Sequence, residues 1–326
     1  MKRPVLHVVS VSGGKDSLAT LLLALKRCRP GTVRAIFCDT GNEHADVYAY
    51  LAYIEWAIGV QIVRLKADFA EQINAKRMFI ARDQRTGRDK SGRKLRWSNK
   101  AKRRAMAVLV PTGNPFLDLC LWKGRFPSRR AQFCTEELKR NMAVGYQLDQ
   151  MEAGFNVVSW QGIRRDESLN RSHAKKTERV GKGLWIMRPI VEWTAADVFN
   201  YCARHKVKPN PLYLQGMGRV GCMPCINVAK DELREIAGRW PEHIERIEEW
   251  ERLVGAASKR GASTFLSDGH QAKDRRVVFA DLNIRSRVEW AKTTRGGKQY
   301  DLLADAEGIA GCSSSYGLCD QWSEGA

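Results

Sequence analysis

Six consecutive residues near the N-terminus have the composition of a loop that binds phosphate. Ser12-Gly13-Gly14-Lys15-Asp16-Ser17 follows an apolar run from Val5 to Val11 and precedes a stretch of helix-forming residues. Paired glycines let a backbone approach phosphate oxygens closely, and a helix N-terminus directly after them offers N–H groups and a favourable dipole. Lys15 would supply a cation. The loop therefore predicts a site for the phosphates of a nucleotide, with a plain strand-to-helix turn as the alternative.

The nine cysteines point to metal or thiol chemistry where they cluster. Cys222 and Cys225 lie two residues apart in a turn with Gly221 and Pro224, so both thiolates could face one metal. A redox-active pair is the competing interpretation. Three further cysteines are candidates for the same chemistry: Cys134, Cys312 and Cys319. The remaining four stand singly among apolar neighbours, where a small buried side chain is expected: Cys28, Cys38, Cys120 and Cys202.

Alternating strands and helices must position these residues. Apolar runs predict strands at residues 5–11, 33–37, 61–65 and 155–160, with helices at 17–25 and 45–58. This alternation implies an α/β fold with a doubly wound, mainly parallel sheet and helices on both faces. Residues 186–190 resemble a short edge segment, and Thr194 should cap a helix that reaches Arg204. Loops at the carboxyl ends of parallel strands converge, so the candidate residues should meet in one crevice.

The chain is long enough for two domains. We expect residues 1–210 to form a nucleotide-binding domain with a basic insertion at about 76–130, and residues 211–326 to form a smaller, Cys-containing helical region. No uninterrupted apolar stretch reaches eighteen residues, which predicts a cytoplasmic protein without membrane association.

The net charge of +19, from 55 Lys and Arg against 36 Asp and Glu, suggests a polyanionic partner such as DNA or tRNA. Thirteen of these cations, against two Asp, lie between Lys76 and Arg104. That stretch is expected to be an exposed loop or a mobile insertion. A solvated basic loop without a nucleic-acid contact is the alternative.

Residues 10–17 closely resemble the pyrophosphate loop of the N-type ATP pyrophosphatases, the adenine nucleotide alpha-hydrolase-like superfamily that includes the PAPS and APS reductases. Segments 37–43, 162–171 and 188–194 are similar to the same family and occur in its order. The resemblance implies that an adenosine nucleotide, either ATP or PAPS/APS, is bound by Ser10, Ser12, Gly13, Gly14, Lys15, Asp16, Ser17, Asp39, Gly162, Arg164 and Arg171. It implies catalytic roles for Lys15, Asp16, Arg164, Arg165 and Cys312.

Residues 215–225 resemble the stretch of the APS reductases whose CxxC binds a [4Fe–4S] cluster, and residues 133–139 resemble an earlier stretch with tandem cysteines. Phe133 replaces the first tandem cysteine here. The resemblance thus implies three cluster ligands, Cys134, Cys222 and Cys225. A cysteine of the C-terminal tail would be the fourth, with Cys319 favoured as ligand and Cys312 as thiol nucleophile. The tail does not reproduce the Glu-Cys-Gly-Leu-His type ending of the reductases.

Two functions fit these features. The first is a sulfurtransferase that cleaves ATP with Mg²⁺ and modifies a nucleic acid, supported by the net charge and by resemblance to the DNA phosphorothioation sulfurtransferase subunit. The second is a reductase of PAPS or APS that uses a thiol nucleophile and no ATP. Either function requires a sulfur or electron donor protein. The final substrate and the oligomeric state stay open, and a non-catalytic nucleotide-binding role is disfavoured because Lys15, Asp16 and Ser17 are all present.

Overall fold

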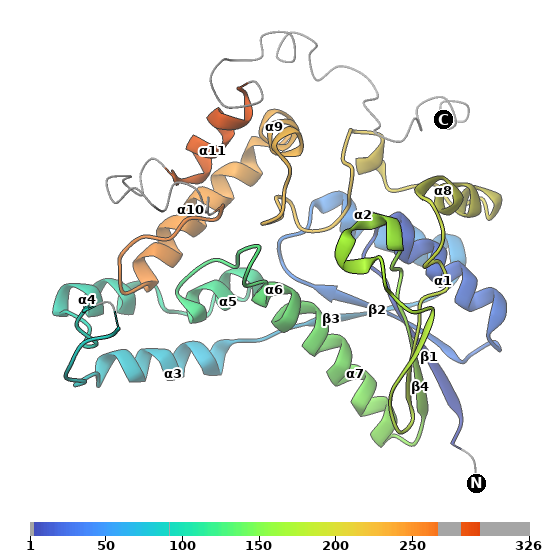
Figure 1. Cartoon of the computed structure of the whole chain (residues 1–326), viewed down its shortest axis with the longest axis horizontal. Coiled ribbons are helices and arrows are strands. Elements are labelled where there is room, and N and C mark those ends of the chain that lie inside the picture. The colour runs from blue at the N-terminus through green and yellow to red at the C-terminus, as the bar shows by residue number, and fades with distance from the viewer. Residues whose placement is uncertain (1–2, 91, 267–281, 294–326) are drawn as a thin grey trace. The chain divides into compact units, whose positions relative to one another are not determined.

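The computed structural model describes residues 3–90, 92–266 and 282–293 (Figure 1). The chain divides into two compact units. Among the described residues, unit 1 comprises 3–66 and 138–222, and unit 2 comprises 67–137 and the segments that follow residue 222. The expected basic insertion at about 76–130 therefore lies within unit 2. The expected division at residue 210 stays a prediction.

Unit 1 contains a six-stranded sheet with the strand order β3-β2-β1-β4-β6-β5. The strands are β1 (Val5–Ser10), β2 (Val33–Asp39), β3 (Ile62–Lys66), β4 (Asn156–Trp160), β5 (Thr177–Gly181) and β6 (Leu184–Met187). All neighbouring strands are parallel except β5 and β6, which form an antiparallel pair. The predicted mainly parallel α/β sheet is confirmed.

The edge of the sheet differs from the expectation. The expected edge segment at 186–190 overlaps β6, which is an inner strand between β4 and β5. The edge strand is β5, which is exposed along its whole length. Because β5 buries no apolar side chain, its sequence lacks the hydrophobic pattern that reveals the other strands.

Helices cover both faces of the sheet in unit 1: α1 (Lys15–Arg27), α2 (Ala45–Ile58), α7 (Asn141–Glu152) and α8 (Ala195–Arg204). Leu6 and Val8 of β1 pack in one core cluster with Tyr146 and Met151 of α7. Successive strand residues point to opposite faces, and α1 packs against β1 and α8 on the other side (Figure 1). Thr194 caps α8 by accepting a hydrogen bond from the Asp197 N–H, as the sequence predicts.

Unit 2 is helical. Its helices are α3 (Ala70–Ala81), α4 (Asn99–Val108), α5 (Pro115–Lys123), α6 (Phe133–Thr135), α9 (Lys230–Arg239), α10 (Pro241–Ala257) and α11 (Ile284–Ala291). A π-helical turn, η1 (Glu136–Arg140), follows α6 and precedes α7. In the core of unit 2, the Phe116 ring stacks with those of Phe126 and Trp250, and Phe265 packs edge-on against Phe126. None of the helices in the described ranges has both the length and the apolar character that a membrane span requires.

The basic stretch from Lys76 to Arg104 is only in part the expected loop, because residues 76–81 belong to α3 and residues 99–104 to α4. The exposed loop between these helices has a buried anchor. Asp83 is only 3% exposed and accepts hydrogen bonds from the Arg85 side chain at 2.8 Å and the Trp97 N–H at 2.7 Å. These bonds, that of Arg85 above all, hold the pKa of the Asp83 carboxyl well below its usual range. An antiparallel bridge between Arg88 and Lys94 joins two segments of the loop. One of the two Asp residues in this basic stretch, Asp83, thus anchors the loop.

Candidate nucleotide site

The phosphate loop connects β1 to α1 as the sequence predicts. Ser10 ends β1, and Lys15 is the first residue of α1. Gly13 has a φ of +75°, a backbone conformation that glycine adopts without strain. The Ser17 hydroxyl accepts a hydrogen bond from the Ser12 N–H at 3.1 Å and donates one to the Gly14 carbonyl at 2.8 Å. The Ser17 hydroxyl therefore holds the backbone of the loop in place, in addition to its predicted contact with the nucleotide.

Lys15 is buried against aromatic rings. Its side chain is held beside Asp16, with 3.0 Å between Nζ and Oδ2, and the residue is 7% exposed. The Nζ atom lies 5.5 Å from the centroid of the Tyr213 ring and 5.9 Å from that of Phe199. A cation in such surroundings is poorly hydrated, so its attraction to a phosphate is stronger than it would be in water.

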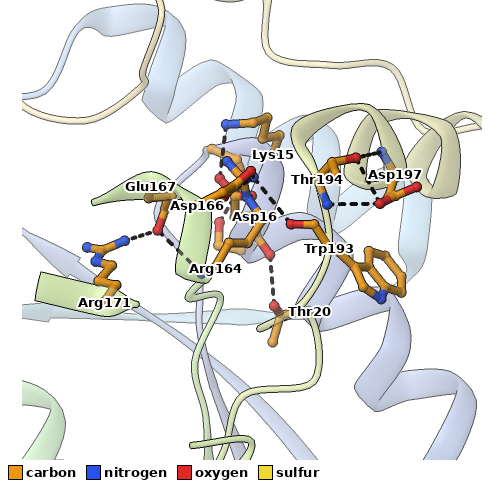
Figure 2. Close-up of polar contacts among 12 residues, drawn as sticks. Lys15, Asp16, Thr20, Arg164, Asp166, Glu167, Arg171, Trp193, Thr194 and Asp197 are labelled. Carbon is orange, nitrogen blue, oxygen red and sulfur yellow. Dashed lines mark hydrogen bonds and ion pairs between the residues drawn. The ribbon is translucent and has the colours of Figure 1, made fainter. Parts of the chain in front are cut away.

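Asp16 and Arg164 join the phosphate loop to the segment after β4 (Figure 2). Arg164 Nε donates to Asp16 Oδ1 at 2.6 Å, and Arg164 Nη1 donates to both carboxylate oxygens of Asp166. Arg164 is 4% exposed. Burial alone would lower the pKa of this guanidinium, but Asp16, Asp166 and Glu167 together raise it above its usual value. Arg164 is therefore a permanent buried cation that holds Asp16 in place.

Gly162 allows this junction to form. A Cβ atom at this position would lie 2.7 Å from the carbonyl oxygen of Asp16 and 3.0 Å from the Ser17 N atom. Both neighbours are backbone atoms in the first turn of α1, so they cannot move aside as a flexible side chain would. Gly162 is thus required here by the close approach of two backbones.

The other predicted arginines are more exposed. The Arg165 side chain is 42% exposed and pairs with Glu192 at 3.3 Å, while Arg171 pairs with Glu167. Arg165 also donates to the Ala174 carbonyl at 3.1 Å. The structure thus brings Arg164 to the phosphate loop and places Arg165 and Arg171 further out, where their predicted contacts with the nucleotide stay predictions.

Asp39 ends β2, the strand next to β1, where the resemblance places the adenosine. Its Oδ1 atom accepts hydrogen bonds from the Gly41 N–H at 2.9 Å and from the Tyr48 hydroxyl at 2.8 Å. Burial and the carboxylates of Glu43 and Asp39 raise the pKa of Tyr48 well above its usual value, so Tyr48 stays protonated and acts as a donor. The loop after β2 is therefore held by a carboxylate and a phenol.

Two buried residues at the phosphate loop escaped the sequence analysis. Asn210 donates from Nδ2 to the Gly13 carbonyl at 3.2 Å, and the Tyr213 hydroxyl accepts from the Lys15 N–H at 3.1 Å. Asn210 caps the start of the turn η4 (Pro211–Tyr213), and Tyr213 is the last residue of this turn. An Asn before a Pro is a signal for a turn, but no local signal in the sequence shows that this turn contacts a loop at the other end of the unit.

Cys222 lies in unit 1 beside the loop that follows β2. It forms an isolated antiparallel bridge with Glu43, and its Sγ atom is 3.3 Å from the Thr40 hydroxyl and 3.8 Å from Glu43 Oε1. In unit 2, Cys225 Sγ accepts a hydrogen bond from the Asn227 N–H at 3.5 Å, and Cys134 lies in α6.

The described residues do not present a set of cluster ligands. In residues 3–90, 92–266 and 282–293, no three His, Cys, Asp or Glu side chains gather as a metal-binding group. Cys222 belongs to unit 1, whereas Cys134 and Cys225 belong to unit 2, and their role as cluster ligands stays a prediction. Cys312 and Cys319, the expected nucleophile and fourth ligand, lie outside the described residues.

The solitary cysteines have the properties of inert thiols. Cys120 and Cys202 are buried, and Cys28 and Cys38 are half-buried. Burial raises the pKa of Cys38 to about 11 and that of Cys202 to about 12. A thiol with such a pKa is almost wholly protonated at neutral pH and is a poor nucleophile.

Comparisons with known proteins identify a family that matches most of the chain. The family described as "Phosphoadenosine phosphosulfate reductase domain" matches residues 6–228. An uncharacterized 37.8 kDa protein of Escherichia phage 186 is 46% identical over 97% of each chain. An adenosine 5'-phosphosulfate reductase of Geobacillus sp. is 34% identical over 28% of this chain, and the match spans only 40% of that enzyme. A solved phosphoadenylyl-sulfate reductase of Candida auris has 16% identity and a TM-score of 0.39, covering 68% of this chain and 82% of its own.

Proposed function

The chain belongs to the phosphoadenosine phosphosulfate reductase domain family, and on that premise we propose that it is a sulfurtransferase that binds ATP in unit 1 and modifies a nucleic acid. The family supplies the nucleotide-binding fold and a general enzymatic role. The observation that carries the proposal is the junction of Asp16 and Arg164, which fixes the first turn of α1 behind a loop of paired glycines.

The proposed reaction begins at the phosphate loop. A substrate oxygen attacks the α-phosphorus of ATP, and pyrophosphate leaves. A hydrosulfide delivered by the donor protein then displaces AMP, which departs with the substrate oxygen, so that a C–S or P–S bond replaces the bond to that oxygen. The loop N–H groups and the N-terminus of α1 stabilise the charge that develops on the departing phosphates. Lys15 adds a cation whose position is fixed by Asp16, so little reorganisation is needed when the charge develops. Arg164 acts through Asp16 and is a positioning residue.

Mg²⁺ accompanies ATP in this scheme and supplies charge neutralisation on the phosphates. Protein sites often hold this ion through one or two carboxylates together with the phosphates themselves. Asp16 already pairs with Lys15 and Arg164, and the described residues gather no group of three potential ligands. No residue of this chain is therefore assigned to the metal.

The proposal of a nucleic-acid substrate rests on the net positive charge of the chain. An excess of nineteen positive charges is larger than a small nucleotide requires, and the exposed loop after α3 concentrates part of it. The choice between DNA and tRNA, the sulfur or electron donor protein and the cytoplasmic location accompany the proposal as predictions from the sequence.

Pyrophosphate release tests the proposal. We expect the purified protein to release pyrophosphate from ATP and a nucleic acid to stimulate that release. Lys15→Ala should lower the rate roughly a hundredfold, the usual effect of removing one group that stabilises charge in a transition state. Lys26→Ala, at the opposite end of the same helix, is the matched control and should leave the rate unchanged. Sulfite formation from PAPS or APS with a thiol, without pyrophosphate release, would contradict the proposal.

A second candidate function is reduction of PAPS or APS. The similarity to an adenosine 5'-phosphosulfate reductase favours it. In this reaction a cysteine thiolate attacks the sulfur of the bound nucleotide, the nucleoside phosphate leaves, and an external thiol then releases sulfite. Cys312 is the predicted nucleophile. Cys312→Ser should abolish sulfite formation in this case and leave pyrophosphate release intact in the sulfurtransferase case.

The [4Fe–4S] cluster is a separate prediction, and neither proposed reaction depends on it. If Cys134, Cys222 and Cys225 bind a cluster, protein prepared without oxygen should be brown and contain roughly four iron atoms per chain. Cys222→Ser should then lose both colour and iron, whereas the buried control Cys202→Ser should keep them. Elemental analysis and visible absorption decide this, and a colourless protein with one zinc per chain would exclude the cluster.

A further inference from the structure

Strands β5 and β6 form an exposed ribbon at the edge of the sheet in unit 1. We call residues 175–187 the β5–β6 ribbon. Thr177 pairs with Met187 and Arg179 with Trp185, so the strands run antiparallel from one end of the ribbon to the other. β5 has no further strand on its outer side within the described sheet. The ribbon was not among the features that the sequence singled out.

Cations dominate the ribbon. Four of its side chains are exposed Lys or Arg, and none of the four forms an ion pair within the described ranges: Lys175, Lys176, Arg179 and Lys182. The one carboxylate of the ribbon belongs to Glu178, and it pairs with Arg188 at 3.0 Å. The ribbon therefore presents a positive surface whose charge is not balanced by neighbouring side chains.

An aromatic ring lies among these cations. Trp185 is 45% exposed, and the Arg179 guanidinium lies 5.8 Å from the centroid of its ring. The two residues are direct partners across the strands, so both side chains stand on the same face of the ribbon. An exposed indole beside a guanidinium can stack on a nucleobase while neighbouring cations contact the phosphates.

The ribbon is attached to the segment that carries Arg164. Arg165 donates to the carbonyl of Ala174, the residue before the ribbon, and Arg188 donates to the Lys175 carbonyl at 3.0 Å. Arg188 also donates to Gln161 at 3.2 Å, directly before Gly162. All of these residues belong to unit 1, so a ligand on the ribbon would lie in the same compact unit as the phosphate loop.

Protection of an edge strand is the plain explanation for exposed lysines, because charges discourage pairing with another sheet. That explanation accounts for Lys176 and Lys182 but not for Trp185. An exposed aromatic ring favours association, and it works against the protection that the charges would give.

We propose that the β5–β6 ribbon binds a single-stranded segment of the nucleic-acid substrate, with its phosphates on the four cations and a base stacked on Trp185. This inference rests on the proposed function, which it deepens by placing the substrate on unit 1 rather than on the basic loop of unit 2. DNA and RNA share the chemistry that the ribbon recognises.

The test is binding of fluorescent single-stranded DNA and RNA of equal length over a range of salt concentrations. The variant with Lys175, Lys176, Arg179 and Lys182 replaced by Gln should bind more weakly than the wild-type protein. For a single strand, removing one cation that neutralises a phosphate lowers the slope of log affinity against log salt by about 0.7, so the slope should fall by about 3. Trp185→Ala should weaken binding roughly tenfold with little change in slope.

A matched variant carries the same loss of charge elsewhere in unit 1. Its four Gln replace exposed cations near the far end of α1: Lys26, Arg27, Arg29 and Arg34. It should keep the wild-type affinity and slope. Equal binding by the ribbon variant and the wild-type protein would overturn the inference, as would tighter binding of the duplex than of either strand. Aggregation of the ribbon variant with unchanged affinity would assign the lysines to edge protection alone.

The design separates this inference from the proposed function. Pyrophosphate release without nucleic acid should be the same in the ribbon variant and the wild-type protein, whereas stimulation by nucleic acid should be lost. If the wild-type protein releases pyrophosphate but binds no nucleic acid, the inference and the assigned substrate are both wrong and only ATP cleavage survives. If it binds nucleic acid through the ribbon without cleaving ATP, the inference holds and the proposed reaction is wrong.

Discussion

Replacing Gly162 with alanine is expected to lower the affinity of unit 1 for its nucleotide roughly a hundredfold. The new Cβ would lie 2.7 Å from the Asp16 carbonyl oxygen, so either the first turn of α1 or the end of β4 must move. Overpacking of this kind costs about 3 kcal/mol when the obstructing atoms are backbone, which corresponds to about a hundredfold in a binding constant.

Isothermal titration with ATP and with APS measures this effect, and thermal unfolding shows whether the variant is folded. Gly145→Ala in α7 is the matched control, because its added Cβ meets no atom within 4 Å. The control should bind like the wild-type protein and be slightly more stable, as alanine is the better helix former. Equal nucleotide affinity in both variants would mean that the loop does not need the close approach at Gly162.

Loss of Arg164 should have the second large effect. In Arg164→Met the Asp16 carboxylate keeps Lys15 but loses its guanidinium partner, while Asp166 is half exposed and can be hydrated. Removing one partner of a buried ion pair costs about 3–5 kcal/mol, and we expect about 3 because one of the two carboxylates reaches water. Nucleotide affinity should fall as well, since Arg164 no longer holds the Asp16 carboxylate that positions Lys15.

Urea unfolding and nucleotide titration of Arg164→Met measure the two parts of this prediction. Arg165→Met is the control for the unfolding measurement alone, because its exposed ion pair with Glu192 should contribute less than about 1 kcal/mol. An Arg164→Met protein that is as stable as the Arg165 control would show that the junction is not a stabilising element.

The phosphate loop is the part of the site that the sequence predicts best. A strand, two glycines and a helix follow one another within a few residues, so the signals for this turn are local in the sequence. The capped start of α8 is a second local feature, and Thr194 and Asp197 form it as predicted.

Residues distant in sequence could not be assigned in this way. Asn210 and Tyr213, at the turn η4, contact the loop. Arg164 follows β4 and donates to Asp16, which follows the neighbouring strand β1. The resemblance assigns Arg164 to the ligand, which stays a prediction, and the structure adds that its Nε and Nη1 atoms donate to two carboxylates of the same chain, those of Asp16 and Asp166. A residue type shows which bonds a side chain can form, and only the fold shows which of them are formed.

The sequence by itself thus determined the strand–loop–helix of the predicted phosphate site, the mainly parallel sheet and the positive charge of the protein. These depend on local composition, on hydrophobic periodicity and on simple counts of residues. The tertiary structure decided the partners of Arg164, the need for glycine at 162, the anchor at Asp83 and the edge position of β5. Each of these depends on the approach of segments that are separate in the sequence, and burial makes such contacts strong because water no longer competes for the polar groups.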